Sequence, residues 1–156
     1  MKLTPDWVVG FVDGEGCFHV SLTRHPEMTA GYQVLAEFVV VQHKRDVAVL
    51  HALKRFFGHG VVRPNHGEER YAYRVRDLDG LAKICDFFLR HPLKTRKNVD
   101  FRKFRRIVLL MQQGEHLSRS GLLRIIRLAE TMNTQDRPAL EQIRQELQSS
   151  LSRGKE

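Results

Sequence analysis

Residues 8–16, with the sequence VVGFVDGEG, constrain the fold of this chain more than any other stretch. They combine a short apolar run with two glycines, Gly10 and Gly14, that stand four positions apart. Residues four apart lie on the same side of a helix, so these glycines leave a strip without side chains. The spacing therefore predicts a helix that packs closely against another helix through this strip.

Two acidic residues, Asp13 and Glu15, follow at the expected end of this helix. The carbonyl end of a helix already carries partial negative charge, so acidic side chains there are unfavourable without a nearby cation. Magnesium is commonly bound by one or two carboxylates, and water or phosphate completes its shell. The pattern predicts such a cation beside the helix end. The alternative is that Asp-Gly-Glu-Gly only terminates the helix, because glycine is a common helix cap.

Hydrophobic periodicity predicts an α+β fold. Thr4 and Pro5 suit the N-cap and first position of a helix, and alternating apolar residues mark the strands. We expect strands at 17–24, 32–42, 61–65 and 70–76, and helices at 5–14, 46–57, 78–89, 94–113, from Ser118 or Ser120 to 132, and at about 137–151. This α-β-β-α-β-β-α order, followed by C-terminal helices, corresponds to an antiparallel four-stranded sheet with helices on one face.

The length of 156 residues predicts one domain over 1–156, with its core at about 5–133 and a C-terminal helix at about 137–151. A formal net charge of +8 favours a polyanionic partner such as nucleic acid. The chain has no apolar run of about 18 residues and no signal pattern, so we expect an intracellular protein without a membrane partner. Cys17 and Cys85 form no CxxC pair and have no histidine partners at zinc-site spacing, which predicts reduced, partly buried thiols.

One face of the predicted sheet carries polar side chains. An arginine row on the last strand, formed by Arg70, Arg74 and Arg76, is its clearest feature. A two-stranded ribbon fits the DNA major groove, where arginine reads guanine and an amide reads adenine. The alternative is an ordinary solvated sheet face. The candidate DNA-binding residues are His19, Ser21, Thr23, Gln33, Glu37, Arg63, Asn65, Arg70, Arg74 and Arg76.

The chain resembles the LAGLIDADG family of homing endonucleases. In residues 8–16 the matching positions are Gly10, Asp13, Glu15 and Gly16, with Phe11 and Val12 as apolar equivalents. Five further segments follow the family's order and spacing: 32–43, 56–60, 71–75, 92–97 and 114–117. The resemblance covers roughly residues 5–133, and it favours DNA readout by the polar sheet face.

The resemblance implies magnesium-dependent cleavage of both strands of a DNA duplex, and Mn²⁺ or Ca²⁺ can take the metal's place. Glu15 occupies the family's metal-ligating acidic position, with the backbone carbonyl of Gly14 beside it. Gln42 matches a polar position that orders water. Arg96 or Lys97 matches the basic position that stabilises the phosphate, and Lys94 lies in the same segment. A further basic residue is expected just past Gln42, at Lys44, Arg45 or neither.

The motif occurs once, whereas cutting two strands requires two sets of acidic ligands. We therefore expect a homodimer that acts on a partly palindromic target. The predicted dimer interface comprises Val9, Gly10, Asp13 and Gly14, and Asp13 is also expected to have a structural role at the helix end. The family further includes non-catalytic DNA-binding regulators and RNA intron maturases, which remain alternatives. The reading frame is expected to be intron-encoded or free-standing.

Overall fold

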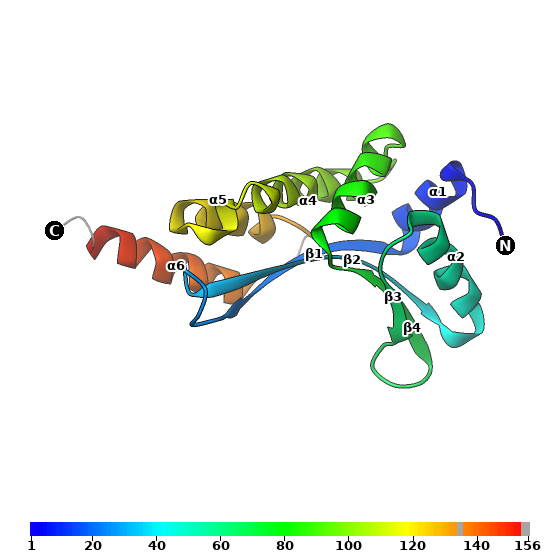
Figure 1. Cartoon of the computed structure of the whole chain (residues 1–156), viewed down its shortest axis with the longest axis horizontal. Helices are drawn as coiled ribbons and strands as arrows, with labels where there is room; N and C mark the ends of the chain where they lie inside the picture. The colour runs from blue at the N-terminus through cyan, green and yellow to red at the C-terminus, as the bar shows by residue number, and fades with distance from the viewer. Residues whose placement is uncertain (134–135, 154–156) are drawn as a thin grey trace.

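The computed structural model describes residues 1–133 and 136–153 (Figure 1). These residues form four strands and six α-helices in an α+β arrangement, which confirms the predicted fold class. The elements are α1 (Pro5–Glu15), β1 (Gly16–Arg24), β2 (Tyr32–His43), α2 (Val47–Phe57), β3 (Val61–Pro64), β4 (Arg70–Val75), α3 (Leu78–Arg90), α4 (Lys97–Gln112), α5 (Arg119–Glu130) and α6 (Pro138–Arg153), with 3₁₀ turns at Lys44–Asp46 and Glu115–Leu117.

The four strands form an antiparallel sheet in the order β1-β2-β4-β3. Alternate residues of each strand point toward the helices, where Phe18, Phe38 and Tyr73 are almost completely buried. The Phe18 ring lies 5.2 Å from that of Phe104 and 5.4 Å from that of Phe101, both in α4. Figure 1 shows α1 to α5 on one side of the sheet and α6 beside the far end of the β1–β2 hairpin. The opposite side of the sheet therefore carries no described helix.

The element boundaries follow local chemistry, with one clear difference from the prediction. The Thr4 hydroxyl caps α1, and Gly58 adopts a left-handed φ of 75° that ends α2. The helix predicted from residue 94 begins only at Lys97. The reason is that the backbone N–H groups of Lys94 and Thr95 donate to the Asp13 carboxylate in α1. Apolar periodicity could not reveal this contact between distant segments.

The C-terminal segment closes the open edge of β1. The Asn133 side-chain amide donates to the Phe18 carbonyl at 2.9 Å, and Arg137 donates to the Val20 carbonyl at 3.0 Å. An uncovered strand edge invites pairing with other chains, so these contacts protect it. The inner face of α6 joins the main core through Leu140, Ile143 and Leu147. No helix of the described residues is long and apolar enough to cross a membrane.

Candidate active site

The C-terminal tip of α1 carries an exposed carboxylate. Glu15 is the last residue of α1, directly before β1. The Gln42 amide nitrogen lies 3.2 Å from Glu15 Oε2, and it also donates to the Val41 carbonyl at 2.9 Å. Glu15 forms no salt bridge among residues 1–133 and 136–153. A carboxylate accepts several hydrogen bonds, so this one keeps capacity for a further ligand.

Asp13, two residues earlier, accepts hydrogen bonds on both carboxylate oxygens from its own chain. Its Oδ2 accepts from the Lys94 backbone N–H at 2.7 Å. Its Oδ1 accepts from the Thr95 hydroxyl at 2.7 Å and the Thr95 backbone N–H at 3.2 Å. Asp13 therefore joins α1 to the segment before α4, in agreement with the predicted structural role. The sequence argument missed Thr95, whose only signal was a polar residue after the helix break at Pro92.

Lys97 places a positive charge at the end of α1. Its Nζ donates to the Val12 carbonyl at 2.9 Å and to the Asp13 carbonyl at 3.0 Å. Partial burial lowers the pKa of Lys97, while Cys17 and the Asp13 and Glu15 carboxylates act in the opposite direction. Part of the positive charge that the sequence predicts beside the helix end therefore comes from this ammonium, which offsets the helix dipole. Glu15 remains without a cationic partner among the described residues.

The side chains of the other predicted basic residues form no hydrogen bond with the end of α1 in the part of the chain that the structure describes. Arg96 is the exposed N-cap residue of α4, and Lys94 is also exposed. Past Gln42, the Lys44 ammonium pairs with Glu69 at 2.6 Å, and Arg45 lies 3.6 Å from Asp46. Of the candidate basic residues, Lys97 is thus the one that the fold brings against the tip of α1.

The donors at this tip suit part of a magnesium shell. Glu15 offers a carboxylate, and the Gly14 carbonyl is among the last four of α1, which have no partner within a helix. The described residues contain no group of three or more His, Cys, Asp or Glu side chains able to hold a metal. One chain therefore provides an oxygen-rich but incomplete site, as magnesium allows when phosphate and water supply the remaining ligands.

The glycine strip of α1 is exposed in the single chain. A Cβ atom added at Gly10 or Gly14 would meet nothing within 4 Å. Trp7 is 42% exposed on the same helix and stacks on Phe11, with ring centroids 4.7 Å apart. Val9 differs from its predicted place at an interface, because it is only 7% exposed and packs in the core of its own chain.

Asp13 also differs from its predicted place at an interface. Its carboxylate points to the segment before α4, as described above, and so is not directed at the glycine strip. The strip is thus formed by Gly10 and Gly14 alone among the four predicted interface residues.

The sheet face opposite the helices contains the predicted DNA-binding residues. The register pairs His19 with Glu37, Ser21 with Leu35, and Thr23 with Gln33 along β1 and β2. Burial lowers the pKa of His19, which favours the neutral imidazole. The exposed members of the predicted set are Thr23, Gln33, Arg63, Arg70 and Arg76, and the half-buried ones are His19, Ser21, Asn65 and Arg74.

Glu37 departs from the predicted outward, solvated position. It is only 7% exposed because Arg74 and Arg76 cover it. Arg74 Nη1 lies 2.8 Å from Glu37 Oε1, and Arg76 Nε lies 2.9 Å from Glu37 Oε2. Alternation along a strand gave the correct face but not this ion-pair cluster.

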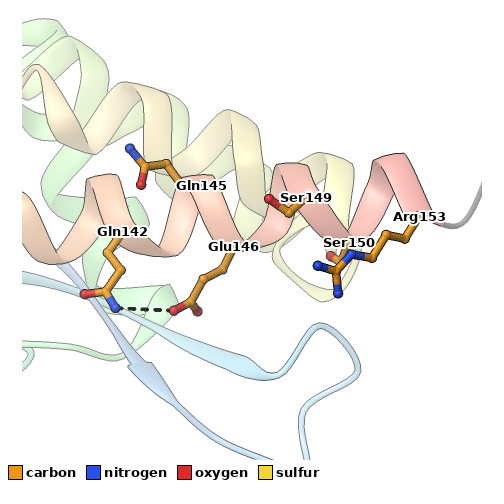
Figure 2. Close-up of a pocket in the computed structure, with 6 residues that line it drawn as sticks. All are labelled: Gln142, Gln145, Glu146, Ser149, Ser150 and Arg153. Carbon is orange, nitrogen blue, oxygen red and sulfur yellow. Dashed lines mark hydrogen bonds between the residues drawn. The ribbon is translucent and has the colours of Figure 1, made fainter.

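A separate hollow of about 430 Å³ lies on α6. Figure 2 shows a hydrogen bond between Gln142 and Glu146, with Ser149, Ser150 and Arg153 farther along the helix. The Gln142 amide nitrogen lies 3.4 Å from Glu146 Oε1. Glu146 also accepts from Arg24 at 2.8 Å and from the Tyr32 hydroxyl, both at the end of the β1–β2 hairpin. The hollow contains none of the residues at the tip of α1, so it is not part of the candidate active site.

The sequence profile of the LAGLIDADG endonuclease family matches residues 8–108, which is more than half of the chain. The chain belongs to this family. LAGLIDADG proteins of known structure share its fold: a superposition on the crystal structure of the homing endonuclease I-TnaI has a TM-score of 0.90 at 56% identity. It covers 94% of this chain and 99% of the I-TnaI chain.

A second LAGLIDADG structure, I-SmaMI bound to an uncleaved DNA target with calcium ions, superposes with a TM-score of 0.86 at 35% identity. This match covers 90% of the present chain but only 48% of the I-SmaMI chain. An ND4 intron 1 protein of Podospora anserina is 34% identical over 75% of this chain and 26% of its own length. The chain thus spans between 25% and 29% of the length of this protein and of two probable intron-encoded endonucleases of Neurospora crassa.

Proposed function

We propose that this chain is a site-specific DNA endonuclease. The observation that carries the proposal is the exposed Glu15 carboxylate at the tip of a glycine-faced helix, next to Gln42 and close to the Lys97 ammonium. The three groups come from α1, β2 and α4, so only the tertiary structure brings them together. An acidic ligand, a polar group that orients water and a cation are the parts needed for metal-assisted phosphodiester hydrolysis.

The proposed substrate is double-stranded DNA, bound on the sheet face opposite the helices. The net charge of +8 and the exposed polar side chains of that face support this choice. The DNA-bound I-SmaMI structure, which shares the fold, supports it independently. We infer that the chain is intron-encoded and acts inside the cell, since relatives such as the Podospora protein are intron products.

The proposed active form is a homodimer. The I-TnaI chain is matched over 99% of its length, whereas the I-SmaMI chain is about twice as long as the matched part. The present chain would thus supply one half of a two-fold arrangement. Two copies packed through Gly10 and Gly14 would bring both Glu15 carboxylates to neighbouring phosphates, and the target would be partly palindromic.

Magnesium is the proposed cofactor, with Mn²⁺ or Ca²⁺ as possible occupants. Glu15 and the Gly14 carbonyl would hold it, and it would polarise a water molecule and neutralise charge on the phosphate. Gln42 would orient that water, because its amide already points at the Glu15 carboxylate. Lys97 would hold positive charge near the phosphate oxygens. Its lowered pKa would let it exchange a proton with the leaving oxygen more readily than Arg96.

Incubation of the purified chain with a library of duplexes and Mg²⁺ tests the proposal. We expect cuts in both strands at a restricted set of sequences, and no cuts in the presence of EDTA. Selective binding without cleavage would indicate a non-catalytic regulator instead. Stimulation of intron RNA splicing, without DNA cleavage, would indicate a maturase.

The dimer has its own test at Gly10. Because a Cβ there meets nothing in the single chain, Gly10→Ala should leave the monomer folded and even favour the helix by about 0.5–1 kcal/mol. The same methyl group would push two packed helices apart. Sedimentation should therefore show weaker dimerisation, together with slower double-strand cleavage. An unchanged dimer with unchanged cleavage would exclude this strip as the interface.

A further inference from the structure

Glu37 is a buried carboxylate on the sheet face that we assign to DNA. It lies in the middle of β2 and is only 7% exposed, although no described helix covers this face. One oxygen accepts from Arg74 Nη1 at 2.8 Å and the other from Arg76 Nε at 2.9 Å. A carboxylate buried to this degree persists when such charge-assisted hydrogen bonds replace water.

The two arginines that share Glu37 are not equivalent. The Arg74 side chain is 26% exposed, and its second terminal nitrogen donates to the Asn65 side-chain oxygen at 2.9 Å. Both terminal nitrogens of Arg74 therefore already donate a hydrogen bond inside the chain. The Arg76 side chain is 53% exposed and is bound only through Nε. Its Nη1 and Nη2 have no hydrogen-bond partner within residues 1–133 and 136–153.

This difference decides which arginine can read a base. Arginine recognises guanine by donating two N–H groups to O6 and N7, so it needs two donors on one edge. Arg76 offers Nη1 and Nη2 together without a partner among the described residues, whereas both terminal nitrogens of Arg74 already donate to Glu37 and Asn65 and its side chain is only 26% exposed. The bond that Arg76 Nε donates to Glu37 also holds the guanidinium in one orientation, which reduces the entropy lost on binding.

We propose that Glu37 is a specificity-positioning residue, which aims Arg76 at a single guanine in the major groove, while Arg74 only cross-links the sheet. This inference rests on the proposed endonuclease function and names one element of its substrate, a G·C pair at a fixed place in each half of the target. In this proposal Glu37 itself contacts no base, because it is only 7% exposed beneath the two arginines.

The test uses the full chain and a cleavage library in which each target position is randomised. The wild-type protein should prefer G·C at one position per half-site. Arg76→Ala and Glu37→Gln should each lower that preference by about 10- to 100-fold at this position and leave the other positions unchanged. Arg74→Ala is the matched control, and it should keep the guanine preference within about 2-fold of wild type.

A modified base sharpens the result. Placing 7-deazaguanine at the identified position removes N7, so wild-type binding in Ca²⁺ should weaken about 10-fold while Arg76→Ala binding should not change. If circular dichroism shows that Glu37→Gln does not fold, a second pair of variants is used. The guanine preference of the double variant Glu37→Gln/Arg74→Met is then compared with that of Arg74→Met alone. The same loss of guanine preference is expected there, and retained preference would overturn the role of Glu37.

The inference and the proposed function fail in different ways. A wild-type protein that cuts no duplex in the library would overturn the endonuclease assignment and this inference with it. Selective cutting with an unchanged preference in Arg76→Ala, or loss of the guanine preference in Arg74→Ala, would overturn the inference alone. A purely structural role of Glu37 would lower the melting temperature but would not change base preference at one position.

Discussion

The tip of α1 and the centre of the sheet each present a glutamate, and the two have opposite surroundings. Glu15 is exposed and has one neutral donor, the Gln42 amide at 3.2 Å. Glu37 is 7% exposed and is clamped by two guanidinium groups. Both oxygens of Glu37 are bound and covered inside the chain, whereas Glu15 is exposed and keeps acceptor capacity for an outside ligand. The comparison teaches that the surrounding donors decide whether an acidic residue serves the fold or binds a ligand.

Asp13 extends the comparison, because it lies only two residues from Glu15 and yet behaves like Glu37. Three donors from Lys94 and Thr95 satisfy its carboxylate. Within one motif, the acidic residue that is saturated holds the fold together. The one that is left open is the proposed metal ligand.

The largest effect is expected for Glu15→Gln. It keeps the shape and the contact with Gln42 but removes the charged oxygen, so cleavage should fall about 1,000-fold or more while DNA affinity changes little. Single-turnover cleavage and equilibrium binding of the same duplex measure the two effects. Glu141→Gln, at an exposed position of α6, is the control and should cut normally. Retained cleavage in Glu15→Gln would show that this carboxylate is not a ligand.

Asp13→Asn should act first on stability. The amide cannot accept all three hydrogen bonds, so the free energy of unfolding should fall by about 2 kcal/mol. Urea unfolding followed by circular dichroism measures this change. If the protein instead keeps its full stability and loses only cleavage, Asp13 acts in the reaction as Glu15 does, and its assignment to a structural role is wrong.

Arg74→Ala should have a smaller effect on stability, of about 1 kcal/mol. Glu37 would keep Arg76 as a partner, and its other oxygen would regain some contact with water. The arginine row of the sequence predicts that Arg74 reads a base, but its bonds to Glu37 and Asn65 favour a cross-linking role. Thermal unfolding of Arg74→Ala beside Arg76→Ala tests this assignment, since Arg74→Ala loses the bonds to Glu37 and Asn65 whereas Arg76→Ala loses only the bond to Glu37, so Arg74→Ala should be the less stable of the two.

The smallest effect concerns pH. Burial lowers the pKa of Lys97 below the ordinary value of 10.5. At a pH between the lowered pKa of the folded state and this ordinary pKa, the unfolded chain binds more protons at Lys97 than the folded chain does. The contribution of Lys97 to stability should therefore rise with pH in that window. Urea unfolding of wild type and Lys97→Met from pH 7 to about 10.5 should show a difference that grows in favour of wild type. Lys54→Met, at an exposed position of α2, is the control. A constant difference for Lys97→Met would mean that burial does not affect its titration.

Local sequence determined the elements, because a strand buries every second residue and a helix buries one side whatever their partners are. The alternation around Phe38 was enough to predict which residues lie on each face of the sheet, and the Gly10–Gly14 spacing was enough to predict the glycine strip. The acidic motif also located Glu15 at a helix tip. What the tertiary structure decided was which charges meet: Lys97 crosses 84 positions to reach the Asp13 carbonyl, and Arg74 crosses 37 to reach Glu37. Such contacts depend on the packing of whole elements, which no local pattern of residues records.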